Sequence, residues 1–375
     1  MLNKFEHIYI HWPFCRSKCY YCDFLSFCNK EDYQQKYHNV LIEQIKKFKN
    51  TKKIKTIFLG GGTPSIYPLD LLEELFFQLK SSFDLSETRE ITIEANPKDI
   101  TKEKLEKWKE LGINRLSIGV QILDDKVLKS LGRNQKVEDV INAIDIAPRY
   151  FDNISVDLIL GLPNVSNINW LKTINTIVSW PIKHISVYLL TLYKGTKLDQ
   201  KIKNKEIFLQ NDDTISSLYL DTVTILKKND FLQYETSNFA KKGFESIHNI
   251  AYWDRRPYLG LGLGASSFNG LNRFVNEKNL NIFLEKGQSA LLEDTYREIV
   301  SKKEAFLETL MLGLRQRKGV GLQRMLYFLR DEDKTIFLNN ISDLEEQGLI
   351  RLAGGRIFLT LKGILLENEV VLKLV

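Results

Sequence analysis

Six short apolar segments rich in β-branched residues alternate with amphipathic helical segments between residues 5 and 236, and this alternation limits the possible folds. The apolar segments are 7–11, 55–60, 90–95, 115–120, 153–160 and 184–190. Helical patterns occupy 32–48, 69–80, 101–112, 124–132, 138–147, 169–180 and about 212–229. Such alternation predicts βα units around a parallel sheet whose strands are buried on both faces. The repeats predict an α/β fold, a partial (βα)6 barrel.

The composition indicates a folded chain with a sizeable core. Of 375 residues, 43% are hydrophobic and 27% charged, which excludes disordered, collagen-like and disulfide-scaffold classes. No apolar run of ~18 residues is free of charge, Pro and Gly, so no membrane span is expected. The first residues predict a strand rather than a secretory signal. The net charge of +6 is too small and dispersed to indicate nucleic-acid binding. We therefore expect a soluble, cytoplasmic protein.

All four cysteines lie close to the amino terminus, as Cys15, Cys19, Cys22 and Cys28. The spacing Cys15-x3-Cys19-x2-Cys22 predicts three thiolates that converge on one polynuclear centre. Zinc commonly needs a second Cys or His pair, and none is apparent, so zinc-binding or simply buried thiols are the weaker alternative. Three thiolates on a [4Fe-4S] cluster leave one iron without a protein ligand. The amine and carboxylate of an amino acid could fill that place.

Glycine-rich and polar residues fall where the predicted strands end. Ligands of parallel α/β folds gather at the carboxyl ends of the strands. Because all of these points belong to one edge of the predicted barrel, they indicate a ligand-binding rim rather than separate turns. The rim consists of residues 60–65, 94–97 and 119–121, of Asp157 with 161–163, and of Thr191.

The segment CRSKCYYCDF resembles the signature of radical S-adenosylmethionine (SAM) proteins, in which the methionine end of SAM binds the open iron. The resemblance extends over almost the whole chain. In order, YIHWPFCRSKCYYCDF, IFLGGGTPS, ITIEANP, RLSIGVQ, LGR and VDLILGLP resemble the oxygen-independent coproporphyrinogen III oxidase (HemN-like) family of radical SAM proteins. A partial barrel is the fold that this resemblance also implies.

The resemblance implies specific cofactor contacts. A [4Fe-4S] cluster would be held by Cys15, Cys19 and Cys22. SAM would be contacted by Tyr9, Tyr21, Gly61, Gly62, Thr63 and Glu94. Positions that contact a second SAM in the oxidase are matched by Gln121, Arg133, Asp157 and Thr191, and whether a second SAM binds here is open.

The chemistry of the rim residues agrees with these roles. Glycines at 60–62 let the backbone approach a ligand and offer it amides. Glu94 can accept a hydrogen bond from an amine or a ribose hydroxyl, and Arg133 can pair with a carboxylate. Cys28 is expected to be a bystander, because some relatives carry their further cysteine at the position of Phe24.

Three features favour the haem-chaperone branch of this family (HemW) over the oxidase branch. The chain begins a few residues before its first strand, whereas the oxidase has a longer extension. Phe24 follows Cys22 and Asp23, which gives the sequence C-D-F that HemW-like proteins have. The segment from His248 to Trp253 matches the H-N-x-x-Y-W motif of that branch and implies haem binding through His248, since imidazole is a good axial iron ligand. One departure is Ser266, where relatives often have His, which weakens a two-histidine haem site.

The sequence predicts three regions: a radical SAM core over 1–236, a connecting region with the haem motif over 237–300, and a C-terminal domain over 301–375. The last region predicts helices followed by a hairpin around 353–355, a helical, winged-helix-like outline. Such an outline is also typical of DNA readers. The acidic segment DLEEQ on the helix that would face phosphates argues against nucleic acid.

The main hypothesis is a haem chaperone that transfers haem to an unidentified acceptor apoprotein and uses a SAM-ligated cluster. The alternative is oxygen-independent coproporphyrinogen III oxidase, in which an electron donor reduces the cluster, SAM is cleaved and a propionate loses hydrogen. A third hypothesis is a radical SAM enzyme acting on another substrate. No catalytic residue is assigned. Peripheral membrane association through the acceptor, and a dimer, are left open.

Overall fold

The computed structural model describes residues 5–48, 52–286 and 297–375. Its centre is a sheet of six parallel strands that are neighbours in chain order. Each strand ends within one residue of its prediction. They are β1 (His7–Trp12), β2 (Thr56–Gly61), β3 (Glu90–Ala95), β4 (Arg115–Gln121), β5 (Asn153–Leu160) and β6 (His184–Leu189).

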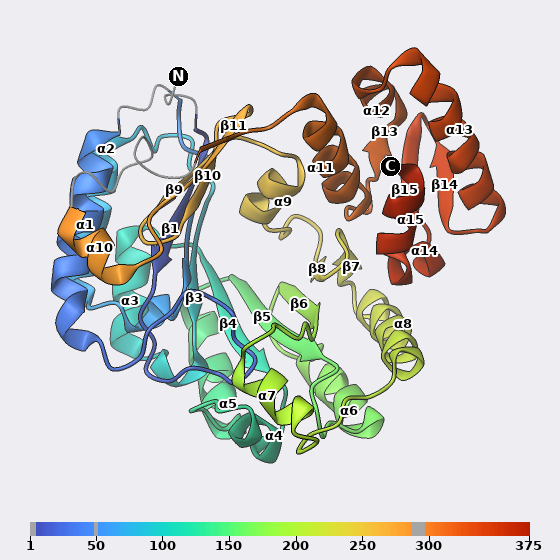
Figure 1. The fold of residues 1–375 in the computed structure, drawn as a ribbon. Helices are drawn as coiled ribbons and strands as arrows, with labels where there is room; N and C mark the ends of the chain where they lie inside the picture. Colours follow the sequence, from blue (N-terminus) through green and yellow to red (C-terminus); the bar gives the residue numbers. More distant parts are fainter. Residues whose placement is uncertain (1–4, 49–51, 287–296) are drawn as a thin grey trace.

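Helices cover the outer face of these strands, as the alternation predicts (Figure 1). Helix α3 illustrates why they begin and end where they do. The Thr101 hydroxyl caps it by accepting from the Lys104 amide, and Gly112 ends it at a φ of +95°. The covering helices are α1 (Gln34–Lys47), α2 (Leu69–Ser82), α3 (Lys102–Leu111), α4 (Asp125–Ser130), α5 (Val137–Ile146), α6 (Asn167–Ile177) and α8 (Asp212–Lys228). Helix α7 (Lys197–Lys203), which the sequence did not predict, contacts the cysteine loop, where the Leu198 amide donates to the Tyr20 carbonyl at 2.8 Å.

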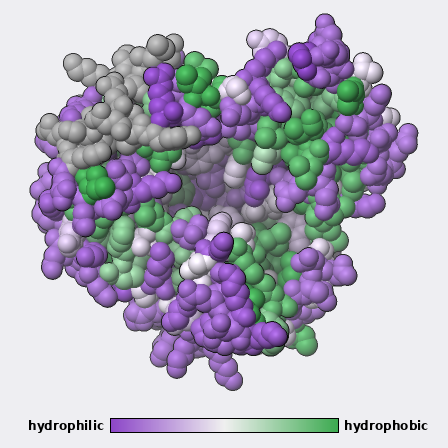
Figure 2. Space-filling model, viewed as in Figure 1, coloured by the Kyte–Doolittle hydropathy of each residue, from purple (hydrophilic) through white to green (hydrophobic). Residues whose placement is uncertain are grey.

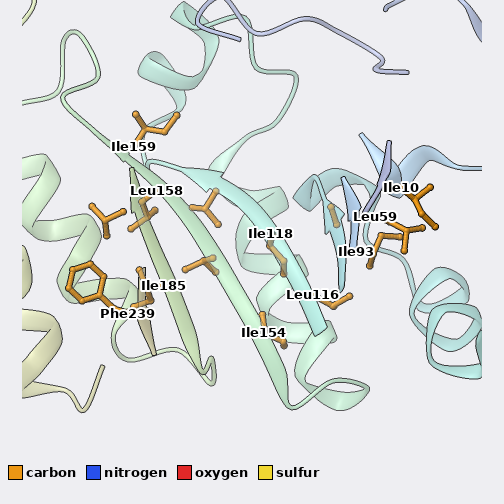
Figure 3. Close-up of a cluster of buried hydrophobic side chains, with 14 of the residues drawn as sticks. Ile10, Leu59, Ile93, Leu116, Ile118, Ile154, Leu158, Ile159, Ile185 and Phe239 are labelled. Atoms are coloured by element: carbon orange, nitrogen blue, oxygen red, sulfur yellow. The ribbon is translucent and has the colours of Figure 1, made fainter. Parts of the chain in front are cut away.

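Alternate side chains of the strands face the helices and the interior of the barrel. The hydrophobic positions pack outward, as Figure 3 shows for Leu59, Leu116 and Ile118. The inward positions of β4 and its neighbours are largely polar, with Ser117 donating to Asp157. A polar interior is not sealed by hydrophobic packing, so the barrel retains room for a ligand.

Further strands extend the sheet at both edges. On one side β9 (Tyr258–Leu261) pairs with β1, followed by β10 (Ser266–Phe268), β11 (Asn272–Val275) and β12 (Arg297–Ile299). On the other side β8 (Asn238–Ala240) pairs with β6 and β7 (Leu232–Gln233). In the described sheet β1 and β6 are not neighbours, so the barrel is open. The predicted partial (βα)6 barrel is confirmed.

The segment that carries the H-N-x-x-Y-W motif forms the short helix α9 (Ile247–Trp253). Figure 1 shows α9 between the barrel strands and the C-terminal helices. It contacts β2 on one side and α11 on the other. Helix α10 (Leu280–Lys286) packs against α1.

The C-terminal region combines helices with a small antiparallel sheet in the order β13–β15–β14. Gly354 and Gly355 turn the predicted hairpin with φ angles of 55° and 69°, which favours glycine. The structure adds two final helices that the sequence did not predict. The elements are α11 (Lys302–Leu314), β13 (Val320–Gly321), α12 (Leu322–Phe328), α13 (Asp331–Glu346), β14 (Ile350–Ala353), β15 (Arg356–Leu359), α14 (Leu361–Leu365) and α15 (Glu367–Leu374).

The molecular surface in this view is mostly hydrophilic, with hydrophobic groups scattered over it, and is hollowed near its centre (Figure 2). Among the described helices, none is both long and apolar enough to cross a membrane.

Candidate functional site

A cavity of about 460 Å³ lies at the carboxyl ends of the barrel strands and is here called the outer cavity. It gathers side chains and backbone from the cysteine loop and from successive strand ends. Twelve of the fourteen predicted site residues line it: Cys15, Cys19, Cys22, Tyr21, Gly61, Gly62, Thr63, Glu94, Gln121, Arg133, Asp157 and Thr191. These residues of the predicted rim therefore form a single surface, whereas residues 161–163 do not line the cavity.

The other two predicted residues, Tyr9 and His248, line a second cavity of about 220 Å³, here called the inner cavity. Glu94, Ser117 and Asp157 line both cavities, so they form the wall between them. The two cavities thus follow one another along the barrel interior.

The cysteine loop is held against the barrel by hydrogen bonds. The Cys15 amide donates to the Phe27 carbonyl at 2.9 Å, and the Thr63 hydroxyl donates to the Cys15 sulfur at 3.3 Å. Burial raises the pKa of Cys15 and that of Cys22, which favours the protonated thiols without a metal. Metal binding would remove these protons, because thiolates are the ligating form.

The arrangement of the thiols bears on the kind of metal centre that they could hold. In the described part of the chain, no three His, Cys, Asp or Glu side chains converge closely enough to hold one metal ion. Each thiolate of a [4Fe-4S] cluster binds a different iron, so the sulfurs need not share one centre. The Arg133 guanidinium lies 3.5 Å from the Cys19 sulfur and would stabilise its thiolate.

The glycines after β2 give close access to the cysteine loop. A Cβ on Gly61, whose φ is +114°, would lie 2.5 Å from the His11 ring, and one on Gly62 would lie 2.8 Å from the Phe14 carbonyl oxygen. The expectation of free amides is not met at these two positions. The Gly61 amide donates to the Glu94 carboxyl at 3.2 Å, and that of Gly62 donates to the Trp12 carbonyl.

Glu94 and Asp157 are two acids in the wall between the cavities. Burial, reinforced by the Asp157 carboxylate, raises the pKa of Glu94 to about 8. Burial also raises the pKa of Asp157, although Ser117 donates to its Oδ2 at 2.8 Å. Asp157 Oδ1 is buried without a hydrogen-bond partner among the described residues. Glu94 therefore favours the neutral form near pH 7 until a ligand supplies a partner.

Arg133 is fixed by the protein. Its Nη2 donates to the Gly119 carbonyl at 2.7 Å and to the side chains of Gln135 and Asn96 at 2.6 and 3.1 Å. Nearby Gln121 has a φ of +69°, unusual for a residue other than glycine, where β4 shifts register against β5. Such backbone strain at a strand end is common at ligand sites.

His248 is fully buried, and both of its ring nitrogens are engaged. Nδ1 lies 2.7 Å from the Thr56 hydroxyl and Nε2 lies 2.9 Å from that of Tyr252. The ring stacks on Phe58 with centroids 5.2 Å apart. Burial lowers the pKa of His248 well below its usual value, so the imidazole is neutral. An iron could bind Nε2 only after the Tyr252 hydroxyl moves away. Ser266 lies on β10, paired with Val275.

Sequence reasoning missed several polar residues of the barrel interior. Arg115 lies in the inner cavity, and Tyr188 lines both cavities. The sequence did carry a signal for Arg115, because a charged residue begins the otherwise apolar run RLSIGV. Tyr188 and Leu189 are 41% and 46% exposed within predicted strand β6, which indicates a surface kept open rather than packed.

Two protein-family models match the sequence of this chain. The radical SAM superfamily matches residues 9–177, which include the cysteine loop and the first five strands. The HemN C-terminal domain matches residues 300–366. The fold and the cavity thus define a radical SAM protein with a HemN-type C-terminal domain, and radical SAM domains imply a [4Fe-4S] cluster and SAM.

The similar proteins narrow this class. The heme chaperone HemW of Bacillus subtilis (strain 168) is 36% identical over 96% of this chain and 97% of its own length. That of Lactococcus lactis subsp. lactis (strain IL1403) is 32% identical over 99% and 97%. The chain belongs to the HemW family of heme chaperones.

A solved structure confirms the fold. The coproporphyrinogen III oxidase HemN from Escherichia coli, a radical SAM enzyme, superposes with a TM-score of 0.86 over all of this chain and 91% of its own. Its sequence is 20% identical, so the likeness is one of fold.

Proposed function

We propose that this protein is a haem chaperone, which binds haem and a SAM-ligated [4Fe-4S] cluster and passes haem to an acceptor protein. Membership of the HemW family over nearly the full length carries the proposal. The outer cavity supports it, because the three cysteines and the predicted SAM residues other than Tyr9 line one surface.

In this proposal Cys15, Cys19 and Cys22 would hold the cluster, and the reduced cluster with SAM beside it would supply one-electron chemistry. Arg133 stabilises the Cys19 thiolate. The glycines of the β2 end give SAM room against the loop. Glu94 in its neutral form can donate a hydrogen bond, and in its charged form it can accept one from an amine.

His248 is the proposed haem ligand. Its neutral imidazole is the form that ligates iron. Haem binding then requires Tyr252 to release Nε2, and the stack on Phe58 and the bond to Thr56 keep the ring oriented when it does. The hydrogen bond at Nδ1 is the second partner that a ligating histidine commonly has.

The test is a haem titration of the anaerobically reconstituted protein, followed by its absorption spectrum. We expect stoichiometric haem binding and a loss of about 10-fold or more in affinity for His248→Ala, with the cluster spectrum unchanged. His184→Ala is the matched control. His184 is also fully buried with both ring nitrogens bonded, to Ser155 and Tyr234, each at 2.8 Å. An unchanged affinity in His248→Ala would overturn the role of His248.

A turnover assay separates the chaperone from the oxidase hypothesis, because the cluster and SAM residues serve both. Anaerobic protein with SAM, a reductant and coproporphyrinogen III should give no catalytic protoporphyrinogen IX. Catalytic formation of that product would replace the proposed function with the oxidase.

A further inference from the structure

Arg115 has an unusual position in the inner cavity. It starts β4, whose outward residues Leu116 and Ile118 pack with the hydrophobic core (Figure 3). Its guanidinium therefore points to the opposite face, into the barrel. Arg115 is only 2% exposed yet lines the inner cavity, and its Nε has no hydrogen-bond partner among the described residues. A buried guanidinium without a bonded anion is costly, so its site is built for a negative partner.

The acids that share the cavity do not supply this partner. Glu94 and Asp157 line it, but no ion pair joins either of them to Arg115 within the described residues. Burial raises the pKa of Glu94 to about 8, so its carboxyl group is mostly neutral near pH 7. A neutral carboxyl group donates a hydrogen bond, as protonated acids in apolar sites do. Glu94 is therefore a second group suited to an incoming carboxylate.

We propose that Arg115 anchors a carboxylate-binding site in the barrel interior, and that the carboxylate it takes is a propionate arm of the porphyrin. The inference rests on the proposed function, since it assigns a place to the haem. The inner cavity, at about 220 Å³, suits a short flexible arm, and it shares Glu94 and Asp157 with the outer cavity.

The proposed iron ligand lies in the same cavity as Arg115. His248 and Tyr252 line the inner cavity, so a porphyrin whose iron reaches His248 would bring a propionate toward Arg115. A guanidinium pairs with a carboxylate by two parallel hydrogen bonds. The amine and carboxylate of SAM belong at the cluster in the proposed function, which leaves the inner site to the propionate.

The experiment compares haem with haem dimethyl ester, in which both propionates are uncharged. Both are titrated into reconstituted wild-type protein, Arg115→Gln, Arg115→Lys and Arg149→Gln, in the same detergent-containing buffer. Arg149 is exposed, on the turn that follows α5, and serves as the control. We expect Arg115→Gln to weaken haem binding about 10- to 100-fold and to leave the diester affinity unchanged. Arg115→Lys should lie between wild type and Arg115→Gln, because lysine lacks the paired donors.

A second measurement is independent of haem and reports on folding. Sodium propionate should raise the melting temperature of the wild type more than sodium chloride of equal ionic strength, and Arg115→Gln should lose this difference. Equal weakening of haem and its diester in Arg115→Gln, or loss of SAM binding with the haem-to-diester ratio unchanged, would overturn the proposal. Wild-type protein that binds neither porphyrin, but responds to propionate through Arg115, would instead overturn the proposed function.

Discussion

The carboxyl group of Glu94 lies in the wall between the outer and inner cavities, where burial and the neighbouring Asp157 oppose its ionisation. The sequence predicts Glu94 as a ligand contact because it ends a strand of the barrel. It does not predict a neutral acid, because this depends on burial inside the barrel and on Asp157, which is brought close only by the pairing of β3, β4 and β5. The same holds for His248, whose partner Thr56 is 192 residues away.

We predict a pH dependence for Glu94. Its pKa is 4.5 in the unfolded chain and about 8 in the folded one, so between these values only the folded chain holds the proton. The stability that the protonated Glu94 contributes to the folded chain is fully present below pH 4.5 and is lost as the pH rises through about 8. Glu94→Gln cannot ionise. The melting temperature of the wild type, measured without SAM, should therefore fall relative to that of Glu94→Gln over this interval. Parallel melting curves at all pH values would contradict it.

The cysteines give a second prediction at this scale. Cys28 does not line the outer cavity, whereas Cys19 does and contacts Arg133. We expect Cys28→Ser to retain the iron–sulfur absorption after anaerobic reconstitution and Cys19→Ser to lose it. Iron and sulfide content measured on both variants checks this. Equal loss in the two would make Cys28 a ligand.

Helix α9 shows what sequence patterns can and cannot establish about an element. The six barrel strands were predicted to within one residue, because each is a continuous apolar run between amphipathic helices. Helix α9 and strands β9 to β12 have seven residues or fewer and no clear periodicity, so their structure depends on distant contacts. Buried Glu90 at the start of β3 provides such a contact, accepting from the Ile247 amide at 2.7 Å and the His248 amide at 3.1 Å.

We predict that Glu90→Ala destabilises the protein and releases α9. The substitution leaves the Ile247 and His248 amides and the Ser246 hydroxyl without their shared acceptor. The expected cost is about 2–4 kcal/mol in the free energy of unfolding by urea, with faster amide exchange in α9. Glu87→Ala, which removes an exposed partner of Lys53, should cost about 0–1 kcal/mol. Equal costs for both substitutions would show that Glu90 does not hold the helix.

Across the whole molecule, the C-terminal helices are joined to the barrel by charged groups beside α9. Arg315, at the end of α11, lies 3.1 Å from the carboxyl of Glu235, which is fully buried between β7 and β8. The same guanidinium lies over the Trp253 ring at 4.9 Å. Just beyond α9, Asp254 pairs with Lys318 at 2.7 Å. The family motif thus contacts the barrel at His248 and the C-terminal helices at Trp253.

These contacts between the barrel and the C-terminal helices predict that two arginine substitutions differ in their effect on stability. Arg315→Met leaves Glu235 as an unpaired buried charge, so it should cost about 3–5 kcal/mol in the free energy of unfolding, because removing one partner strands the other. Arg330→Met removes an arginine of similar chemistry whose side chain is 75% exposed in its pair with Asp333, and it should cost about 0–1 kcal/mol. Urea unfolding measures both. The double variant that combines Arg315→Met with Glu235→Gln should regain part of the lost free energy of unfolding, because the second substitution removes the buried, unpaired carboxylate. If the double variant regains none of it, Arg315 acts through Trp253 rather than through Glu235.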